Sequence, residues 1–215
     1  MVTGRDDVAA VPAGNVPIGN VPIGNVYDKY AATNPVERRF VRGFLAALDA
    51  SMPPMAPSRV LEVGAGEGEV SRRVQDRFPA AAVAGLDLLD AGLGLHWRQR
   101  GLRGVFGDLA LLPFPDDAFD LVLAIEVLEH VPDPEEALGE IARVASADLI
   151  VSVPREPLWR GANLLRGKYV RDVGNTPGHL HHWSRGGFAR LVGRRFEIVE
   201  VRSPFPWTMV QAHVR

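Results

Sequence analysis

The sequence predicts a doubly wound α/β fold, in which parallel strands alternate with helices that cover both faces of one sheet. Apolar and β-branched runs alternate along the 215 residues with segments whose apolar residues recur every three or four positions. One such run, 59–63, passes through a glycine-rich loop directly into a helical pattern. The chain also closes with two strand-like runs, 196–202 and 207–214, which are typical of an antiparallel hairpin.

The glycine loop after residues 59–63 is the first candidate binding element. Gly64, Gly66 and Gly68 permit positive φ angles and remove Cβ atoms, so a ligand can lie against the backbone near a helix N-terminus. The spacing G-x-G-x-G differs from the G-x-G-x-x-G of dinucleotide sites. Glu62, two residues before the first glycine, would repel a pyrophosphate and attract an ammonium group. An NAD-dependent oxidoreductase is therefore the disfavoured alternative.

Two further strands are predicted to end in carboxylates. The run 81–87 ends at Asp87, whose distance along the chain from Gly64 is typical of a residue that accepts hydrogen bonds from ribose hydroxyls. The short run 104–108 ends at Asp108. A nucleoside ligand is expected from these positions, although the Asp87 spacing also fits NAD.

The remaining elements complete the alternation. Asn34, Pro35 and Glu37 form a helix start with an N-cap, a proline at the first helical position and a capping-box glutamate. A fourth strand ends near residue 125 and is followed by a helix, a strand over 147–154 and a helix that begins near Ser184.

The string E-x-G-x-G-x-G at 62–68, with the proline- and acid-rich loop at 112–120 that leads into the fourth strand, resembles class I S-adenosylmethionine-dependent methyltransferases. The resemblance covers about residues 27–215 and implies a seven-stranded Rossmann-like sheet with an antiparallel last strand. It implies S-adenosyl-L-methionine as the cofactor, with Asp108 at the adenine amine and Leu109 donating its backbone N–H to the ring. The cofactor-binding residues it implies are Glu62, Gly64, Ala65, Gly66, Asp87, Leu88, Asp108, Leu109, Glu126 and Tyr30, with Tyr27 as a further contact.

The acceptor side of the site is expected after the fourth strand. His130 is the candidate general base and Glu126 the second candidate catalytic residue. The string Glu126-x-x-Glu129-His130 also resembles the metal site of ubiquinone-biosynthesis and small-RNA O-methyltransferases, so a metal-dependent enzyme that uses these residues with His181 is an alternative. In the preferred interpretation no metal is expected, and Glu129 and His130 pack in the structure or contact the substrate.

The segment 155–183 is too long for a simple connection and is expected to be an insertion over the active site. It mixes five basic with two acidic residues and three large aromatic residues. Such a mixture suits an aromatic, sugar or phosphate-bearing acceptor, and equally a solvated cap. Residues 27–215 are thus expected to form a single domain.

Composition narrows the class of protein. Hydrophobic residues make up 47% and charged residues 23% of the chain, which is ordinary for a globular protein. The net charge of -2 argues against a nucleic-acid partner, and the absence of cysteine excludes thiolate chemistry and disulfides. No apolar run is long enough to cross a bilayer, so a cytoplasmic protein without a membrane partner is expected.

Residues 1–26 carry two and a half copies of a Gly-Asn-Val-Pro-Ile repeat and are expected to form a disordered leader. The preferred function is methyl transfer to the oxygen or nitrogen of a small-molecule acceptor. A non-catalytic methyltransferase-like binding module is the alternative from a different class. The acceptor and the oligomeric state do not follow from the sequence.

Overall fold

The computed structural model describes residues 34–165, 176 and 178–215. The proposed leader at 1–26 and the candidate cofactor contacts Tyr27 and Tyr30 lie outside these residues. In chain order the elements are α1 (Pro35–Ser51), β1 (Arg59–Val63), α2 (Glu69–Arg77), β2 (Ala82–Asp87), α3 (Ala91–Arg100), β3 (Arg103–Phe106), β4 (Phe119–Ile125), α4 (Pro134–Val144), β5 (Ala145–Pro154), α5 (Leu158–Leu165), α6 (Arg185–Val192), β6 (Phe196–Arg202) and β7 (Trp207–Val214).

The predicted seven-stranded sheet is confirmed, with the strand order β3-β2-β1-β4-β5-β7-β6. Strands β1 to β5 pair in parallel, and β7 runs antiparallel to both of its neighbours, so the C-terminal hairpin is also confirmed. The strand order reverses between β1 and β4, which pair directly. In open α/β sheets, ligands bind beyond the carboxyl ends of the strands at such a switch point.

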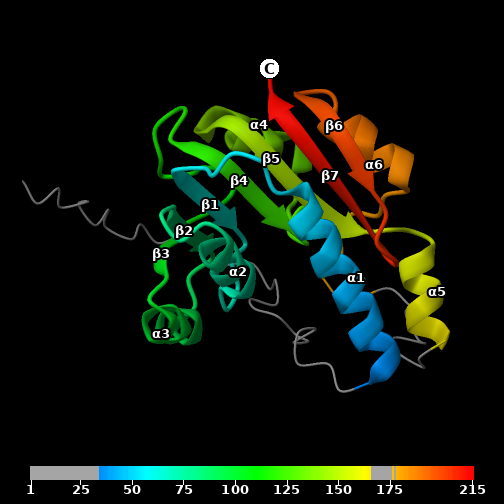
Figure 1. Cartoon of the computed structure of the whole chain (residues 1–215). Coiled ribbons are helices and arrows are strands. Elements are labelled where there is room, and N and C mark those ends of the chain that lie inside the picture. The colour runs from blue at the N-terminus through cyan, green and yellow to red at the C-terminus, as the bar shows by residue number, and fades with distance from the viewer. Residues whose placement is uncertain (1–33, 166–175, 177) are drawn as a thin grey trace, which may run out of the picture.

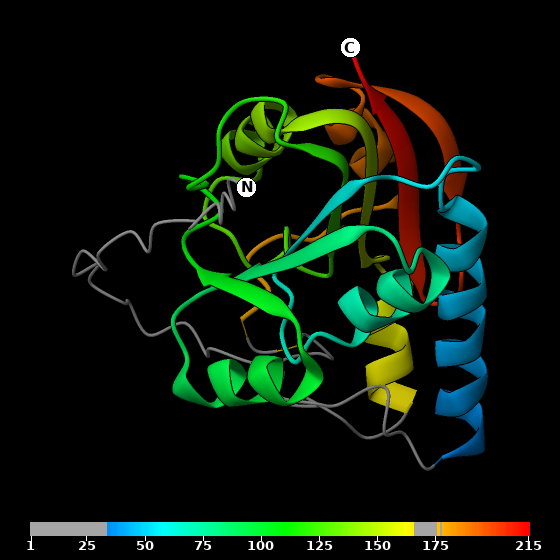
Figure 2. The same cartoon turned by 60° about the vertical axis from the view of Figure 1, so that its left-hand side comes forward.

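Helices cover both faces of the sheet (Figure 1). Phe44 of α1 and Val74 of α2 belong to the core cluster on one face, and Ile141 of α4 and Phe188 of α6 belong to the cluster on the other. Figures 1 and 2 both show α1 beside β7, where the rings of Phe44 and Trp207 lie 5.1 Å apart. Because both faces are buried, the central strands consist almost entirely of apolar residues.

The helix starts follow the chemistry of their first residues. The Asn34 side chain accepts the Val36 N–H at 2.8 Å and Pro35 opens α1, as predicted. The Ser184 side chain caps α6 in the same way. Among the described residues, every helix is too short or too polar to span a bilayer.

Helix α3 is an element that the sequence pattern did not predict. Gly92 and Gly94 weaken its helical propensity, and its apolar residues follow no clear stripe. Its Trp97 side chain lies directly across β3, because a Cβ at Gly104 would come within 1.7 Å of the ring. The tertiary contact of one tryptophan with a strand glycine thus stabilises a helix that local propensity disfavours.

The segment after β5 leaves the sheet and returns to it. It contains α5, and its ends meet where Glu156 donates its backbone N–H to the Trp183 carbonyl at 2.9 Å. The Trp159 ring of α5 lies 5.6 Å from that of Trp207 on β7. Helix α5 therefore packs onto the sheet beside α1.

Candidate functional site

The glycine loop at the end of β1 forms the centre of the candidate site. Gly64, Gly66 and Gly68 have φ values of 66°, 50° and 81°, a region that disfavours other residues. A Cβ at Gly64 would lie 2.2 Å from Cγ2 of Val127, which follows β4. The loops after β1 and β4 thus touch at the switch point, and only a glycine fits between them.

Asp87 holds this loop from the neighbouring strand. One carboxylate oxygen accepts the Gly66 N–H at 2.7 Å and the other accepts the Leu88 N–H at 2.8 Å. Burial raises the pKa of Asp87 above its usual value, an effect that these two amide hydrogen bonds oppose. Each oxygen keeps a second lone pair that could accept a ligand hydroxyl.

Asp108 lies beside Asp87, because Gly107 donates its backbone N–H to the Asp87 carbonyl at 2.9 Å. Its side chain accepts the Ala110 N–H at 2.9 Å, which shapes the turn after β3. Leu109 in that turn is buried in the core. The structure therefore brings the ends of β1, β2 and β3 together as the sequence analysis expected.

Glu62 is placed differently from the other acids. Its side chain is buried, 3% exposed, and accepts a hydrogen bond from the Ser71 hydroxyl at 2.5 Å. Ser71 belongs to the first turn of α2. The carboxylate therefore lies beneath the glycine loop and fastens β1 to α2.

The residues after β4 form a series of bends and turns. Glu126 has a φ of 58°, a left-handed conformation that a non-glycine residue adopts at a cost of about 1–3 kcal/mol. Its backbone N–H donates to the Ser152 carbonyl on β5 at 2.9 Å. Strain at the carboxyl end of a central strand marks this position as a functional candidate.

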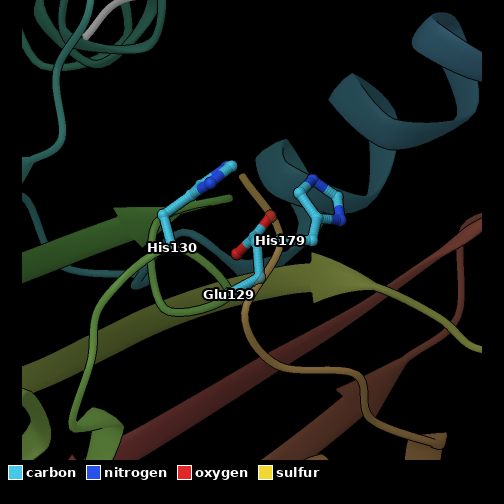
Figure 3. A group of neighbouring side chains, drawn as sticks. All are labelled: Glu129, His130 and His179. Carbon is cyan, nitrogen blue, oxygen red and sulfur yellow. The ribbon is translucent and has the colours of Figure 1, made fainter. Parts of the chain in front are cut away.

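The turns bring Glu129 and His130 next to His179 from the segment after α5. One possible ligand atom from each of the three lies within 4.8 Å of the others, and Figure 3 shows the side chains turned toward one another. Glu129 is buried, and burial, with His130 and His182 nearby, lowers the pKa of His179 to about 3. His179 is therefore neutral at physiological pH.

His181, the further ligand in the metal alternative, lies elsewhere. Its Nε2 donates to the carbonyls of Val131 and Pro132 at 3.0 and 3.2 Å, and its ring stacks on Trp183. A nitrogen that donates to a carbonyl carries a proton and cannot bind a metal. Among the described residues, the structure thus groups His179, and not His181, with Glu129 and His130.

One feature near the site was missed by the sequence analysis. Arg143 of α4 donates to the backbone carbonyls of Leu112 and Phe114 and pairs with Glu140 and Asp116. These carboxylates raise the pKa of Arg143. The pairing fastens the loop that follows Asp108. The i, i+3 spacing of Glu140 and Arg143 on one helix was the available signal.

A seven-stranded Rossmann-like sheet whose last strand is antiparallel is the architecture that the resemblance to class I methyltransferases implies. Comparisons with known proteins agree, because residues 61–151 match the methyltransferase domain family. The resemblance found in the sequence is therefore confirmed, and this stretch carries the domain of class I S-adenosylmethionine-dependent methyltransferases.

Individual relatives of the chain are also named as methyltransferases. The chain is 36% identical over 113 residues to a demethylmenaquinone methyltransferase of Thermus thermophilus, covering 50% of this chain and 51% of that protein. It is 32% identical over 136 residues to a ubiquinone biosynthesis O-methyltransferase of Hahella chejuensis, covering 59% and 56%. The chain thus spans about half the length of these curated relatives.

Among solved structures, an S-adenosylmethionine-dependent methyltransferase of Thermotoga maritima matches with a TM-score of 0.63 at 19% identity, covering 84% of this chain and 95% of that one. At this identity the match supports the fold.

Proposed function

We propose that this chain transfers the methyl group of S-adenosyl-L-methionine to an oxygen or nitrogen of a small-molecule acceptor. The observation that carries the proposal is the contact between the glycine loop and Asp87, which forms an open backbone bend next to a carboxylate at the switch point. The names of the relatives support a small acceptor, because one is a demethylmenaquinone methyltransferase and another a ubiquinone biosynthesis O-methyltransferase.

The residues at the three strand ends suit this cofactor. A Cβ added at Gly64 would fill the space beside Val127, so the bend requires a bare backbone. The partly buried Asp87 carboxylate, already positioned by two amides, can accept the ribose hydroxyls, and Asp108 can accept the adenine amine. Glu62 would act indirectly, by fixing β1 against α2 through Ser71.

Bound cofactor would supply an activated methyl group, so the protein's task is alignment and proton removal. An oxygen or nitrogen acceptor that takes this methyl group would also have to lose a proton. The acceptor's proton passes to Nε2 of His130. His130 is fit for this role because its Nδ1 donates to the Gly178 carbonyl at 2.9 Å, which leaves the lone pair on Nε2.

The cofactor part is tested by titration calorimetry with S-adenosylhomocysteine. Asp87→Asn should weaken binding at least tenfold, since hydrogen bonds to a charged group are worth about 1.5–3 kcal/mol. Asp76→Asn is the matched control, because Asp76 is exposed on α2 and forms one long pair with Arg72 at 3.9 Å. Absence of binding by the parent protein at high micromolar ligand would refute the assignment.

The catalytic part is tested with labelled cofactor and a panel of phenols, sugars and amines. His130→Asn should lower turnover at least a hundredfold and leave the affinity for S-adenosylhomocysteine within about twofold, because general-base catalysis contributes about 10²–10⁴-fold. Cofactor binding without turnover of any acceptor would favour the non-catalytic binding module instead.

A further inference from the structure

The glycine loop is held by α3, a helix that carries none of the candidate site residues. Trp97 of α3 donates its indole Nε1–H to the Gly66 carbonyl at 2.7 Å. Its side chain is buried, 3% exposed, which strengthens the hydrogen bond because the local dielectric constant is low. Arg100 of the same helix donates to the Glu67 carbonyl at 2.6 Å and pairs with the Glu69 carboxylate at 2.6 Å. Two consecutive carbonyls of the loop are therefore bound by side chains of α3.

Gly66 is fixed from both sides. Asp87 of β2 accepts its N–H at 2.7 Å, and Trp97 of α3 donates to its carbonyl at 2.7 Å. The two peptide groups flank the φ and ψ angles of Gly66, whose φ of 50° lies in the left-handed region. A glycine without these partners adopts many other conformations at little cost, because it has no Cβ. The two hydrogen bonds therefore select one backbone shape for the loop.

The indole of Trp97 also contacts the strand that leads to Asp108. It stacks on the Phe106 ring of β3, with centroids 4.9 Å apart and an angle of 20° between the planes. A Cβ added at Gly104 would lie 1.7 Å from the indole, so the contact with the β3 backbone is direct. Trp97 shares a small buried cluster with Ala65 of the glycine loop. One side chain therefore connects the loop after β1 to the strand before Asp108.

These contacts bear on ligand affinity, because a binding loop with several accessible shapes binds more weakly than a loop with one. The apparent affinity falls with the fraction of molecules in which the loop has its binding shape. Without the indole N–H, the Gly66 carbonyl would lose its partner and could regain one by turning the peptide between residues 66 and 67 toward water. That rotation would change the backbone of the loop itself.

We propose that Trp97 and Arg100 are positioning residues, which hold the glycine loop in its binding shape before the cofactor arrives. The inference rests on the proposed function, since it takes this loop to bind S-adenosyl-L-methionine. Neither side chain has to touch the cofactor, because both act through the carbonyls of residues 66 and 67. Loss of either contact should therefore weaken cofactor binding more than loss of a comparable side chain elsewhere.

The first test compares two tryptophans by titration calorimetry with S-adenosylhomocysteine. Trp97→Phe removes the indole N–H and keeps an aromatic ring. Trp207→Phe is the matched control, because Trp207 is almost equally buried, 4% exposed, and its Nε1 has no hydrogen-bond partner in the described part of the chain. Trp97→Phe should weaken binding about three- to tenfold, as expected for one lost hydrogen bond, and Trp207→Phe should leave it within about twofold.

A second pair of variants tests Arg100 at an exposed position, so that the buried core stays intact. Arg100→Gln removes the contacts with Glu67 and Glu69 and should weaken S-adenosylhomocysteine binding about two- to fivefold. Arg98→Gln is the control for the loss of charge, because Arg98 is exposed on the same helix and donates to the Gly94 carbonyl within α3 at 3.1 Å. It should leave the affinity unchanged. Equal affinities of the two arginine variants would contradict the role of Arg100.

Hydrogen exchange measured by mass spectrometry separates this inference from the proposed function, because it needs no ligand. The backbone amides of residues 64–69 should exchange faster in Trp97→Phe than in the parent, and at the parental rate in Trp207→Phe. A parent that binds no S-adenosylhomocysteine would refute the proposed function, and the exchange rates would then decide whether Trp97 holds the loop. Parental affinity and parental exchange in Trp97→Phe, or equal losses of affinity in the two tryptophan variants, would overturn the positioning role.

Discussion

The contact between Gly64 and Val127 joins the two loops of the candidate site, and replacement of Gly64 by alanine tests it directly. The new Cβ would lie 2.2 Å from Cγ2, 3.2 Å from Cγ1 and 3.3 Å from Cβ of Val127. Rotation of the valine side chain moves its methyl groups but not its Cβ. Some backbone shift at the switch point is therefore expected.

The expected loss in the free energy of unfolding has two parts, and a substitution at a second glycine separates them. A left-handed alanine costs about 1–2 kcal/mol, and overpacking adds about 1–3 kcal/mol. Gly101 has a φ of 67°, almost the 66° of Gly64, but an added Cβ there meets no atom within 4 Å. Gly101→Ala should thus lose only the first amount, whereas Gly64→Ala should lose about 2–5 kcal/mol in total.

Urea denaturation followed by tryptophan fluorescence measures both free energies of unfolding, with unchanged m-values as a check on two-state behaviour. Val127→Ala in the Gly64→Ala background should recover at least about 1 kcal/mol as a coupling energy. Equal losses in the two glycine variants, or no coupling between residues 64 and 127, would show that the close approach has no energetic weight.

Three further predictions concern the rest of the fold. Arg143→Ala should lower the free energy of unfolding by about 2 kcal/mol and expose the loop at Leu112 to proteases; recovery of full protection by Arg143→Lys would exclude the forked hydrogen bonding to the loop carbonyls. Asp120 accepts the backbone N–H groups of Ser58 and Arg59 at the start of β1. Desolvation raises the pKa of Asp120, but these hydrogen bonds and the Arg59 guanidinium outweigh it and lower the pKa below its usual value. Asp120→Asn should therefore cost about 1 kcal/mol at pH 7, and the difference should disappear as the pH falls below 3.8 toward the folded-state pKa; a difference that is constant with pH would contradict this. Phe188→Ala, at a fully buried ring, should cost about 3–5 kcal/mol, against less than about 0.5 kcal/mol for Leu95→Ala on the exposed side of α3; similar losses would mean that the α6 face of the core is not packed as described.

Most of the fold was predictable from the sequence because its signals are local. The Asn34 cap predicts a helix start and the apolar run 59–63 predicts a strand, each from a few adjacent residues. The structure has a helix and a strand at these positions. Helix α3 was missed although Asp90 and Gly101 mark its two ends, because its apolar residues follow no clear stripe. It depends on Trp97 packing against Gly104 of β3, which no helical pattern reveals.

One part of the candidate site could be predicted from the sequence and another part could not. The glycine loop and Asp87 could be predicted, because adjacent parallel strands necessarily bring their carboxyl ends to one edge of the sheet. The orientation of Glu62 could not be predicted. Strand alternation places its side chain on the α2 side of the sheet, and the partner Ser71 becomes apparent only when α2 packs there.

The sequence by itself determined the class of fold, the glycine loop after β1 and the presence of several histidines after β5. Only the tertiary structure decided which of these histidines meets Glu129 and His130. The choice of His179 over His181 depends on hydrogen bonds between segments about fifty residues apart, which turn one ring toward the cluster and the other toward the carbonyls of Val131 and Pro132. Residue type and spacing do not predict the orientations of these two rings, because the orientations arise from contacts that exist only in the folded chain.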